Sequence, residues 1–352
     1  MSRYWSRVTS GLTPYVPGEQ PLDQRLVKLN TNESPYPPSP GVRKAISNAS
    51  DDDLRRYPDP ESCALREAIA SRNGLQPQSV FLGNGSDEVI ALCFMSLLKH
   101  DLPLYFPDIS YSFYPVWAGL FEIAYEKVPV CDDFTIDPSA YPVKNGGIII
   151  PNPNAPTGIL MNLDSIRFLL ERCRDSVVVI DEAYIDFGGE SAARLIPDFD
   201  NLLVVQTMSK SRSLAGLRVG YAMGDPALIE GLSRVKNSFN SYPLDVLAQR
   251  AALAAIGDEE YFAECCRRII GSRQKLTEGL VARGFDVLPS YANFVFARHP
   301  DAPAKSVFHG LREHGIIVRH FERERIDNFL RISVGADEEN NALLEALDEL
   351  IK

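Results

Sequence analysis

The sequence predicts an α/β protein with a large, mostly parallel sheet and a second, smaller α+β domain. First, strand-like apolar runs alternate with helical patterns from Val80 onward. Second, residues 177–180 form an unbroken apolar run, which is typical of a strand covered on both faces. Third, long helical patterns begin near Pro243 and are followed by shorter strands. We expect an N-terminal arm (1–33), a large domain (48–242) and a small domain (34–47 plus 243–352).

The first 40 residues are rich in proline and lack any periodic pattern. Such a segment is either disordered or an arm laid over a partner surface. An ordered arm could bring Tyr15 and Asn32 to a site, although packing is the commoner role for such residues. A helical pattern follows at 41–50, and an amphipathic helix is expected from Glu61 to about residue 72.

The run SVFLGNGSDEVI predicts a strand, a glycine-bracketed turn and a helix that starts near Ser86. The free N–H groups of the first helical turn, at the positive end of the helix dipole, form a ready anion site. Gly85 permits close approach of the backbone, while Ser86 and Asp87 can cap the helix. A strand-to-helix turn with a good cap also needs no ligand at all. In the next helical pattern, Tyr111 is either a core residue or an aromatic that stacks on a heterocycle.

The apolar run at 177–180 ends in Asp181, at the edge where open α/β sheets bind their ligands. A carboxylate directly after a buried strand is costly unless a cation partners it. That partner is either a structural arginine or a protonated pyridine nitrogen. Tyr184 follows three residues later and could offer its hydroxyl group to the same ligand.

The next strand-like run, LLVVQTM, leads into the loop SKSRSLAGLRVGY. A lysine amine is a useful nucleophile only when neutral, so Lys210 would need burial or nearby positive charge to lower its pKa. Ser209 and Arg218 could hold a phosphate dianion beside it. This combination suits a Schiff base with a phosphorylated aldehyde, pyridoxal phosphate (PLP). The alternative is an ordinary solvated lysine.

Arg331 lies inside the apolar strand pattern FLRISVG near the C-terminus. A charged residue between Leu330 and Ile332 either points to solvent from a half-exposed strand or enters a cleft to bind an anion.

Composition excludes several classes of function. The chain has 352 residues and a net charge of −11, so it has no basic surplus for nucleic acid or an acidic membrane. No signal peptide or membrane-spanning run is visible, and the six cysteines show no metal-binding or disulfide spacing. We therefore expect a cytoplasmic protein without a metal site.

Taken together, the motifs KLNTNESPYPPSP, RYPDP, NGSDE, PNPNAPTG, DEAY, SKSRSLAGLRVGYAMG and LRISVG resemble those of the fold-type-I PLP-dependent aminotransferases. The resemblance covers residues 15–335 and implies a three-layer large domain beside a smaller α+β domain. Within that family the motifs are most similar to those of enzymes that act on histidinol phosphate. The implied reaction exchanges an amino group between histidinol phosphate or imidazole acetol phosphate and glutamate or 2-oxoglutarate, in histidine biosynthesis.

The resemblance also implies roles for the candidate residues. Lys210 would hold PLP and carry the proton during transfer, and Asp181 would keep the pyridine nitrogen protonated. Tyr184 would contact the ring oxygen, Tyr111 would stack on the ring, and Arg331 would bind the substrate anion. The remaining implied contacts are to the cofactor phosphate (Gly85, Ser86, Ser209, Arg218, with Tyr57 from the neighbouring subunit of a homodimer) and to the substrate (Tyr15, Asn32, Tyr57).

One position departs from the family pattern. The family typically has asparagine immediately before Pro-Thr-Gly, where its amide meets the ring oxygen, but this chain has Ala155 there. Either the loop shifts so that Asn154 makes the contact, which is the version we predict, or Tyr184 makes it alone.

Three other functions compete with this reading. A threonine-phosphate decarboxylase of cobalamin synthesis would also bind a phosphorylated substrate, and an aromatic amino acid aminotransferase would keep the same fold. A PLP-binding sensor is the non-enzyme alternative, although the chain shows no added DNA-binding domain.

Overall fold

The computed structural model describes residues 2–21 and 26–351 and contains one large sheet of seven strands. Residues 1 and 22–25 of the predicted arm and residue 352 lie outside the described residues. The strand order is β2-β8-β7-β6-β5-β3-β4, and β8 alone runs antiparallel to its neighbours. The strands are β2 (Val80–Asn84), β3 (Leu104–Pro107), β4 (Tyr125–Val128), β5 (Ile148–Pro151), β6 (Val178–Asp181), β7 (Leu202–Thr207) and β8 (Val219–Gly224).

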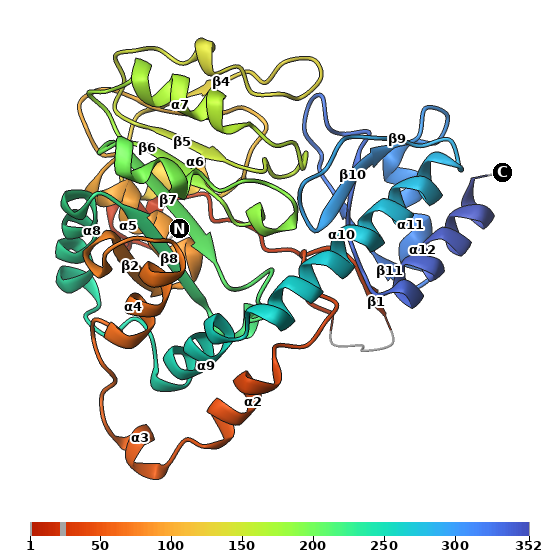
Figure 1. Cartoon of the computed structure of the whole chain (residues 1–352). Coiled ribbons are helices and arrows are strands. Elements are labelled where there is room, and N and C mark those ends of the chain that lie inside the picture. The colour runs from red at the N-terminus through yellow and green to blue at the C-terminus, as the bar shows by residue number, and fades with distance from the viewer. Residues whose placement is uncertain (1, 22–25, 352) are drawn as a thin grey trace.

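Helices cover both faces of this sheet, as the unbroken apolar strands predict (Figure 1). Alternate residues of β6 enter different cores: Val178 and Ile180 face one, and Val179 faces the other. The Val178 side packs against α2 (Pro40–Ser47), α4 (Cys63–Arg72), α7 (Leu163–Arg172) and α9 (Val246–Gly257). The Val179 side packs against α5 (Gly85–Ser96), α6 (Tyr114–Leu120) and α8 (Pro226–Phe239). The predicted three-layer α/β fold is confirmed.

The C-terminal part forms a further core around a four-stranded antiparallel sheet, in the order β12-β13-β10-β9. The long helix α10 (Glu259–Val281) runs from the large sheet to this part (Figure 1). The other elements are β9 (Asp286–Val287), β10 (Phe294–Arg298), α11 (Ala304–Glu313), β12 (Arg319–His320), β13 (Leu330–Ser333) and α12 (Asp337–Leu350).

The packing of α2 and α9 bears on the division into domains. We predicted both helices to belong to the small domain, but Val42 of α2 and Ala251 of α9 are buried in the core of the large sheet. The three-part division remains a prediction, and this packing favours a boundary near the start of α10.

The N-terminal segment is packed where it approaches the two sheets. A short strand, β1 (Val27–Lys28), pairs in parallel with β11 (Ile316–Ile317). Leu29 accepts a hydrogen bond from Ser333 N of β13, and Asn30 and Asn32 are buried beside it. The short helices α1 (Arg7–Gly11) and α3 (Asp51–Arg55) lie nearer the surface.

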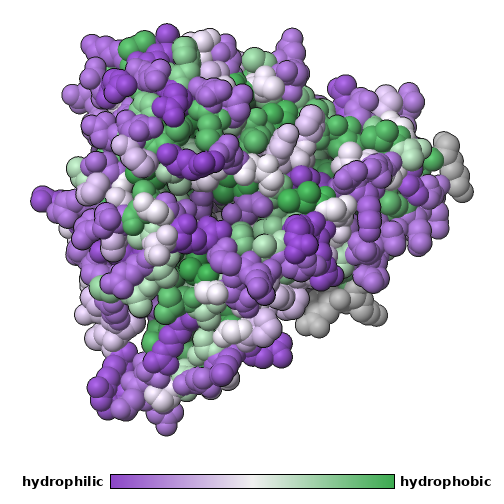
Figure 2. All heavy atoms as spheres, viewed as in Figure 1, coloured by the Kyte–Doolittle hydropathy of each residue, from purple (hydrophilic) through white to green (hydrophobic). Residues whose placement is uncertain are grey.

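The face drawn in Figure 2 is largely hydrophilic on its projecting parts, with hydrophobic residues in patches between them. Within the described residues, no helix is long and apolar enough to cross a membrane.

Candidate active site

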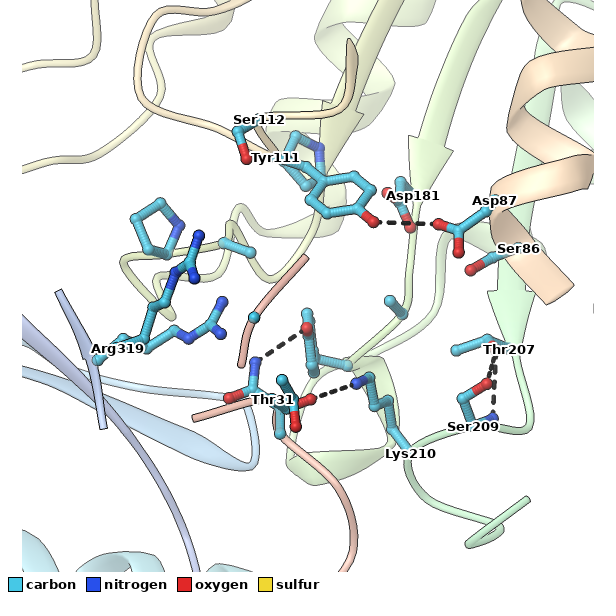
Figure 3. Close-up of a pocket in the computed structure, with 18 of the residues that line it drawn as sticks. Thr31, Ser86, Asp87, Tyr111, Ser112, Asp181, Thr207, Ser209, Lys210 and Arg319 are labelled. Atoms are coloured by element: carbon cyan, nitrogen blue, oxygen red, sulfur yellow. Dashed lines mark hydrogen bonds between the residues drawn. The ribbon is translucent and has the colours of Figure 1, made fainter. Parts of the chain in front are cut away.

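A cavity lies where the carboxyl ends of β5, β6 and β7 meet the N-terminus of α5 and the edge of the small sheet (Figure 3). This is the end of a parallel sheet at which α/β proteins bind ligands, because the loops there diverge. Most of the predicted site residues line it, namely Tyr15, Asn32, Ser86, Asp87, Tyr111, Asp181, Tyr184, Ser209, Lys210, Arg218 and Arg331.

Lys210 follows β7 and points into the cavity (Figure 3). Its Nζ donates a 2.9 Å hydrogen bond to the carbonyl oxygen of Thr31. Burial, and next the positive charge of Arg331, lower the pKa of Lys210 to about 8. A substantial fraction of the amine is therefore neutral near pH 8, as a nucleophile requires.

Asp181 ends β6 and is only 5% exposed. Its Oδ2 accepts a 2.7 Å hydrogen bond from the Tyr114 hydroxyl, whereas Oδ1 has no partner within the described part of the chain. Burial raises the pKa of this carboxyl to about 6. Because an unpaired buried carboxylate oxygen is costly, the site is suited to a ligand that brings an N–H donor to it.

An anion cradle surrounds the start of α5. Ser86 lies in the first turn, and among the described residues Asn84 makes no side-chain cap there, so helix N–H groups remain available. Across from it, Ser209 and Arg218 line the same end of the cavity. Gly85 has φ +80°, and a Cβ at this position would lie 2.5 Å from Arg218 Nη2. Glycine is thus needed for Arg218 to reach the cradle, although Gly85 itself does not line the cavity.

Asp87 connects two other predicted residues. Its Oδ2 lies 3.0 Å from Arg218 Nη2, and its Oδ1 accepts a 3.0 Å hydrogen bond from the Tyr111 hydroxyl. Figure 3 shows Tyr111 extending over the cavity toward this carboxylate. The pair Tyr111–Asp87 therefore fixes the aromatic ring as one wall of the cavity.

Two arginines from the small sheet lie at the end opposite Ser86. Arg331 on β13 enters the cavity instead of pointing to solvent, and its Nη2 donates a 2.7 Å hydrogen bond to Asn30 O. Its Nε has no partner among the residues that the structure describes. Arg319 on β12 lies directly across from Arg331 in the strand register and also lines the cavity (Figure 3).

Sequence reasoning missed Arg319. The signal was available, because Arg319 ends the apolar run at 315–318 in the same way that Arg331 interrupts its own strand. Thr31 and Thr207, which also line the cavity, carried no comparable signal.

The prediction for Asn154 is not supported by its position. Asn154 is buried outside the cavity, where its Nδ2 donates a 2.9 Å hydrogen bond to Ile109 O. Ala155 and Pro156 line the cavity in its place. The side chain is held behind the loop because its backbone N also bonds to Ile159 O, which closes the turn.

Tyr57 lies away from the cavity of its own chain. The residue is 83% exposed, and its ring stacks on that of Tyr242 with the ring centroids 4.6 Å apart. The predicted contact of Tyr57 with a neighbouring subunit's site stays a prediction.

These donors fit PLP group by group. The cradle of Ser86, Ser209 and Arg218 matches a phosphate, and the unpaired Asp181 Oδ1 matches a protonated pyridine nitrogen. Lys210, with its lowered pKa, matches the aldehyde. The two arginines at the far end suit an anionic substrate.

Comparison with known proteins adds independent information. Residues 24–347 match the family model described as aminotransferase class I and II. The chain is 59% identical over 352 residues to histidinol-phosphate aminotransferase 1 of Hydrogenovibrio crunogenus, covering 100% of this chain and 99% of that protein. It is also 59% identical over 348 residues to histidinol-phosphate aminotransferase of Pseudomonas entomophila, covering 99% and 100% respectively.

A solved structure has the same fold as this chain. Histidinol-phosphate aminotransferase from Sinorhizobium meliloti, crystallised in complex with pyridoxal-5'-phosphate, superimposes with a TM-score of 0.90 at 25% identity. The match covers 100% of this chain and 98% of that one.

Proposed function

The chain belongs to the class I and II aminotransferases, and from this premise we propose that it transfers an amino group between histidinol phosphate and 2-oxoglutarate. The reverse direction uses imidazole acetol phosphate and glutamate, and the reaction belongs to histidine biosynthesis. The enzyme is PLP-dependent. The names of the relatives do not favour the decarboxylase or the aromatic aminotransferase.

The observation that carries the substrate proposal is the presence of two separate anion sites in one cavity. Ser86, Ser209 and Arg218 suit the phosphate of the cofactor. Arg319 and Arg331, at the other end, suit a second oxyanion, because a guanidinium group binds phosphate and carboxylate alike. The phosphate of histidinol phosphate and a carboxylate of glutamate can therefore occupy the same place in the two half-reactions.

The bound cofactor supplies an electrophilic aldehyde carbon and a ring that accepts electrons. In our proposal Lys210 Nζ attaches the cofactor and, once released, carries a proton between substrate carbon and cofactor. Asp181 holds the proton on the ring nitrogen, Tyr184 donates to the ring oxygen, and Tyr111 covers one face of the ring. Tyr15, whose ring centroid lies 4.6 Å from that of Phe113, limits the space around the substrate.

We further propose a cytoplasmic homodimer in which Tyr57 completes the neighbouring subunit's phosphate site. Large apolar side chains are exposed around Tyr57, as a surface that is covered by a second copy requires (Leu54, Phe239, Tyr242). The three-part division into arm, large domain and small domain belongs to the same proposal.

The substrate test compares histidinol phosphate with histidinol, which lacks only the phosphate. We expect the wild-type protein to prefer the phosphorylated amine, and Arg319→Gln to reduce kcat/KM for it roughly 10- to 100-fold, because a charge-assisted hydrogen bond is lost. The rate with histidinol should change little in the variant. Equal loss for both amines would contradict the role of Arg319, and release of carbon dioxide from phosphothreonine would replace the proposed reaction.

The dimer test mixes two inactive variants. Lys210→Ala and Tyr57→Ala subunits, co-expressed, would form hybrid dimers with one site that has both an intact lysine and the partner's intact tyrosine. Recovery of activity in the hybrids is the expected result. No recovery, with hybrids demonstrated by differential tags, would show that Tyr57 does not act across subunits.

A further inference from the structure

Asn32 is held unusually firmly for a residue of the N-terminal segment. It is 1% exposed and has φ +56°, a left-handed conformation that asparagine tolerates better than most residues. Its backbone N donates to Ser333 Oγ at 2.9 Å, and its backbone O accepts from Asn293 Nδ2 at 2.9 Å. The backbone N–H and C=O of Asn32 are therefore both held by side chains, one from β13 and one from the residue before β10.

The side chain of Asn32 links Ser333 to Tyr184. Ser333 Oγ lies 2.9 Å from Asn32 Oδ1, and Asn32 Nδ2 lies 3.0 Å from the Tyr184 hydroxyl oxygen. Since a backbone N–H can only donate, Ser333 Oγ already accepts one hydrogen bond, and its own proton goes to Oδ1. If Oδ1 and Nδ2 of Asn32 were exchanged, the Ser333 hydroxyl proton would face an NH₂ group and lose its acceptor, which is costly for a buried hydroxyl.

In this chain of hydrogen bonds each group donates to the next, from Ser333 through Asn32 to the Tyr184 hydroxyl. An amide NH₂ group donates and cannot accept, so the Tyr184 hydroxyl must use a lone pair toward Asn32. Its own proton is then directed elsewhere, and within the described residues no acceptor is hydrogen-bonded to it. Tyr184 lines the cavity, so this proton is available to a ligand there.

The charged groups around Tyr184 are compatible with a protonated hydroxyl. Burial raises the pKa of Tyr184, while Arg331 and the hydrogen bond from Asn32 act in the opposite direction; Asp181 and Asp87 add to the increase, and the net direction is upward. Lys210 Nζ lies 5.8 Å from the centroid of the tyrosine ring. Tyr184 is thus a neutral donor at the pH at which Lys210 becomes a nucleophile.

The neighbouring loop offers no second donor for a ligand oxygen. Ala155 presents a methyl group to the cavity, and the amide of Asn154 is bonded to Ile109 O outside it. A ring oxygen bound in this cavity therefore depends on Tyr184, and on the direction of its proton.

We propose that Asn32 is a positioning residue, which fixes the Tyr184 proton toward the oxygen of the bound cofactor ring in place of the amide that Ala155 lacks. The proposal rests on the proposed function insofar as PLP occupies the cavity. Asn32 acts here through Tyr184, which differs from the substrate contact predicted from the sequence.

The test is a pH titration of the visible absorbance of the PLP-loaded protein, without any amino substrate. Tyr184, by donating to the ring oxygen, draws charge away from it, so the nitrogen of Lys210 gives up its proton at a lower pH. In Asn32→Asp, the new carboxylate accepts a hydrogen bond from the Tyr184 hydroxyl, which then no longer donates to the ring oxygen. We expect the midpoint of the titration to rise by roughly one pH unit.

Two controls separate this effect from added charge. Asn30→Asp introduces the same charge in the same cavity, where the Asn30 amide bonds to Glu19 O and not to Tyr184. We expect it to shift the midpoint less than Asn32→Asp does. In a Tyr184→Phe background, the effect of Asn32→Asp should fall to that of Asn30→Asp.

Ser333→Ala provides a second, milder variant, because it removes the donor that orients the Asn32 amide. It should shift the midpoint in the same direction by a smaller amount. An unchanged midpoint in both Asn32→Asp and Ser333→Ala, or a full shift that persists in Tyr184→Phe, would overturn the proposal. A wrong choice of amino substrate leaves this result unchanged, since none is added.

Discussion

Asp181 and Glu182 are adjacent acidic residues at the end of one buried strand, and they lie in very different surroundings. Asp181 faces the cavity, and one of its carboxylate oxygens has no hydrogen-bond partner among the described residues. Glu182 faces the opposite core, where its oxygens accept hydrogen bonds from Ala192 N at 2.6 Å, Ser191 Oγ at 2.5 Å and Gln206 Nε2 at 2.7 Å. One carboxylate is fully used by the fold, and the other is kept for a ligand.

The pKa values alone would not separate the two residues. Burial raises the pKa of Asp181 from 3.8 to about 6 and that of Glu182 from 4.5 to about 7, so the residue outside the cavity is shifted as much as the residue inside it. What distinguishes them is the supply of hydrogen-bond donors. A perturbed pKa marks burial, whereas an unpaired oxygen in a cavity marks a place for a ligand.

The largest expected effect comes from Asp181→Asn. Without the carboxylate, the protonated ring nitrogen of PLP loses its charged partner, so affinity and activity should fall on the order of 10²- to 10³-fold. Titration with PLP, followed by visible absorbance, measures the affinity. Glu182→Gln is the matched control, because it removes a buried negative charge one residue away and should bind PLP normally. An equal loss of PLP affinity in the two variants would show that Asp181 has no special role in binding the cofactor.

In the cofactor-free protein, the buried charge of Asp181 should lower the free energy of unfolding. Its folded pKa of about 6 lies above the ordinary value of 3.8, so the buried carboxylate destabilises the empty protein once it ionises. Asp181→Asn should therefore raise the free energy of unfolding by roughly 3 kcal/mol above pH 6. The gain should shrink between pH 6 and pH 4 and vanish below, as the wild-type carboxyl becomes protonated.

Urea denaturation of both cofactor-free proteins at pH 8, pH 5 and pH 3.5 measures this difference. A stability gain that is the same at pH 3.5 and pH 8 would mean that the charge of Asp181 is not its cause.

Glu182→Gln should act on stability instead of on the site. Its new NH₂ group would face the donors that now bond to the carboxylate, which lowers the free energy of unfolding by about 1–3 kcal/mol. Burial raises the pKa of Glu182 to about 7, so losing the charge offsets part of this fall above pH 7, and the full fall is expected near pH 5. Thermal or urea unfolding of the PLP-loaded variant measures it. Undiminished stability would show that the bonds to Ser191, Ala192 and Gln206 contribute little.

The smallest effect is expected for Tyr114→Phe, which removes the hydrogen bond that the Tyr114 hydroxyl donates to Asp181. The pKa of Asp181 should rise further, and PLP affinity should fall about 3- to 10-fold. The same titration measures it. A loss as large as that in Asp181→Asn would mean that Tyr114 itself holds the cofactor.

Several residues of the site could be predicted from the sequence. Asp181 and Lys210 were predictable because each follows an apolar run typical of a buried strand, and parallel strands bring their carboxyl ends together. Arg331 stood out for a different reason, as a charged residue inside an apolar strand pattern, and the resemblance implied its role. These residues are placed by strand register, which apolar patterns reveal.

Residues placed by loops were harder to predict. Asn154 was expected in the cavity, but a turn closed by Ile159 holds its amide against Ile109 instead. The link from Asn32 to Tyr184 joins segments 152 residues apart in the chain, and only the folded arrangement shows it. Likewise, the helical pattern of α9 did not reveal which of the two cores it would join.

The central claim is that this cavity moves an amino group from a phosphorylated amine by way of Lys210. The most direct measurement mixes PLP-loaded protein with histidinol phosphate alone, without an oxo acid, while the visible band and the product are followed. We expect the band to disappear and imidazole acetol phosphate to form in an amount equal to the number of active sites, with neither change in Lys210→Ala. A band that stays unchanged with histidinol phosphate, but changes with another amine, would contradict it.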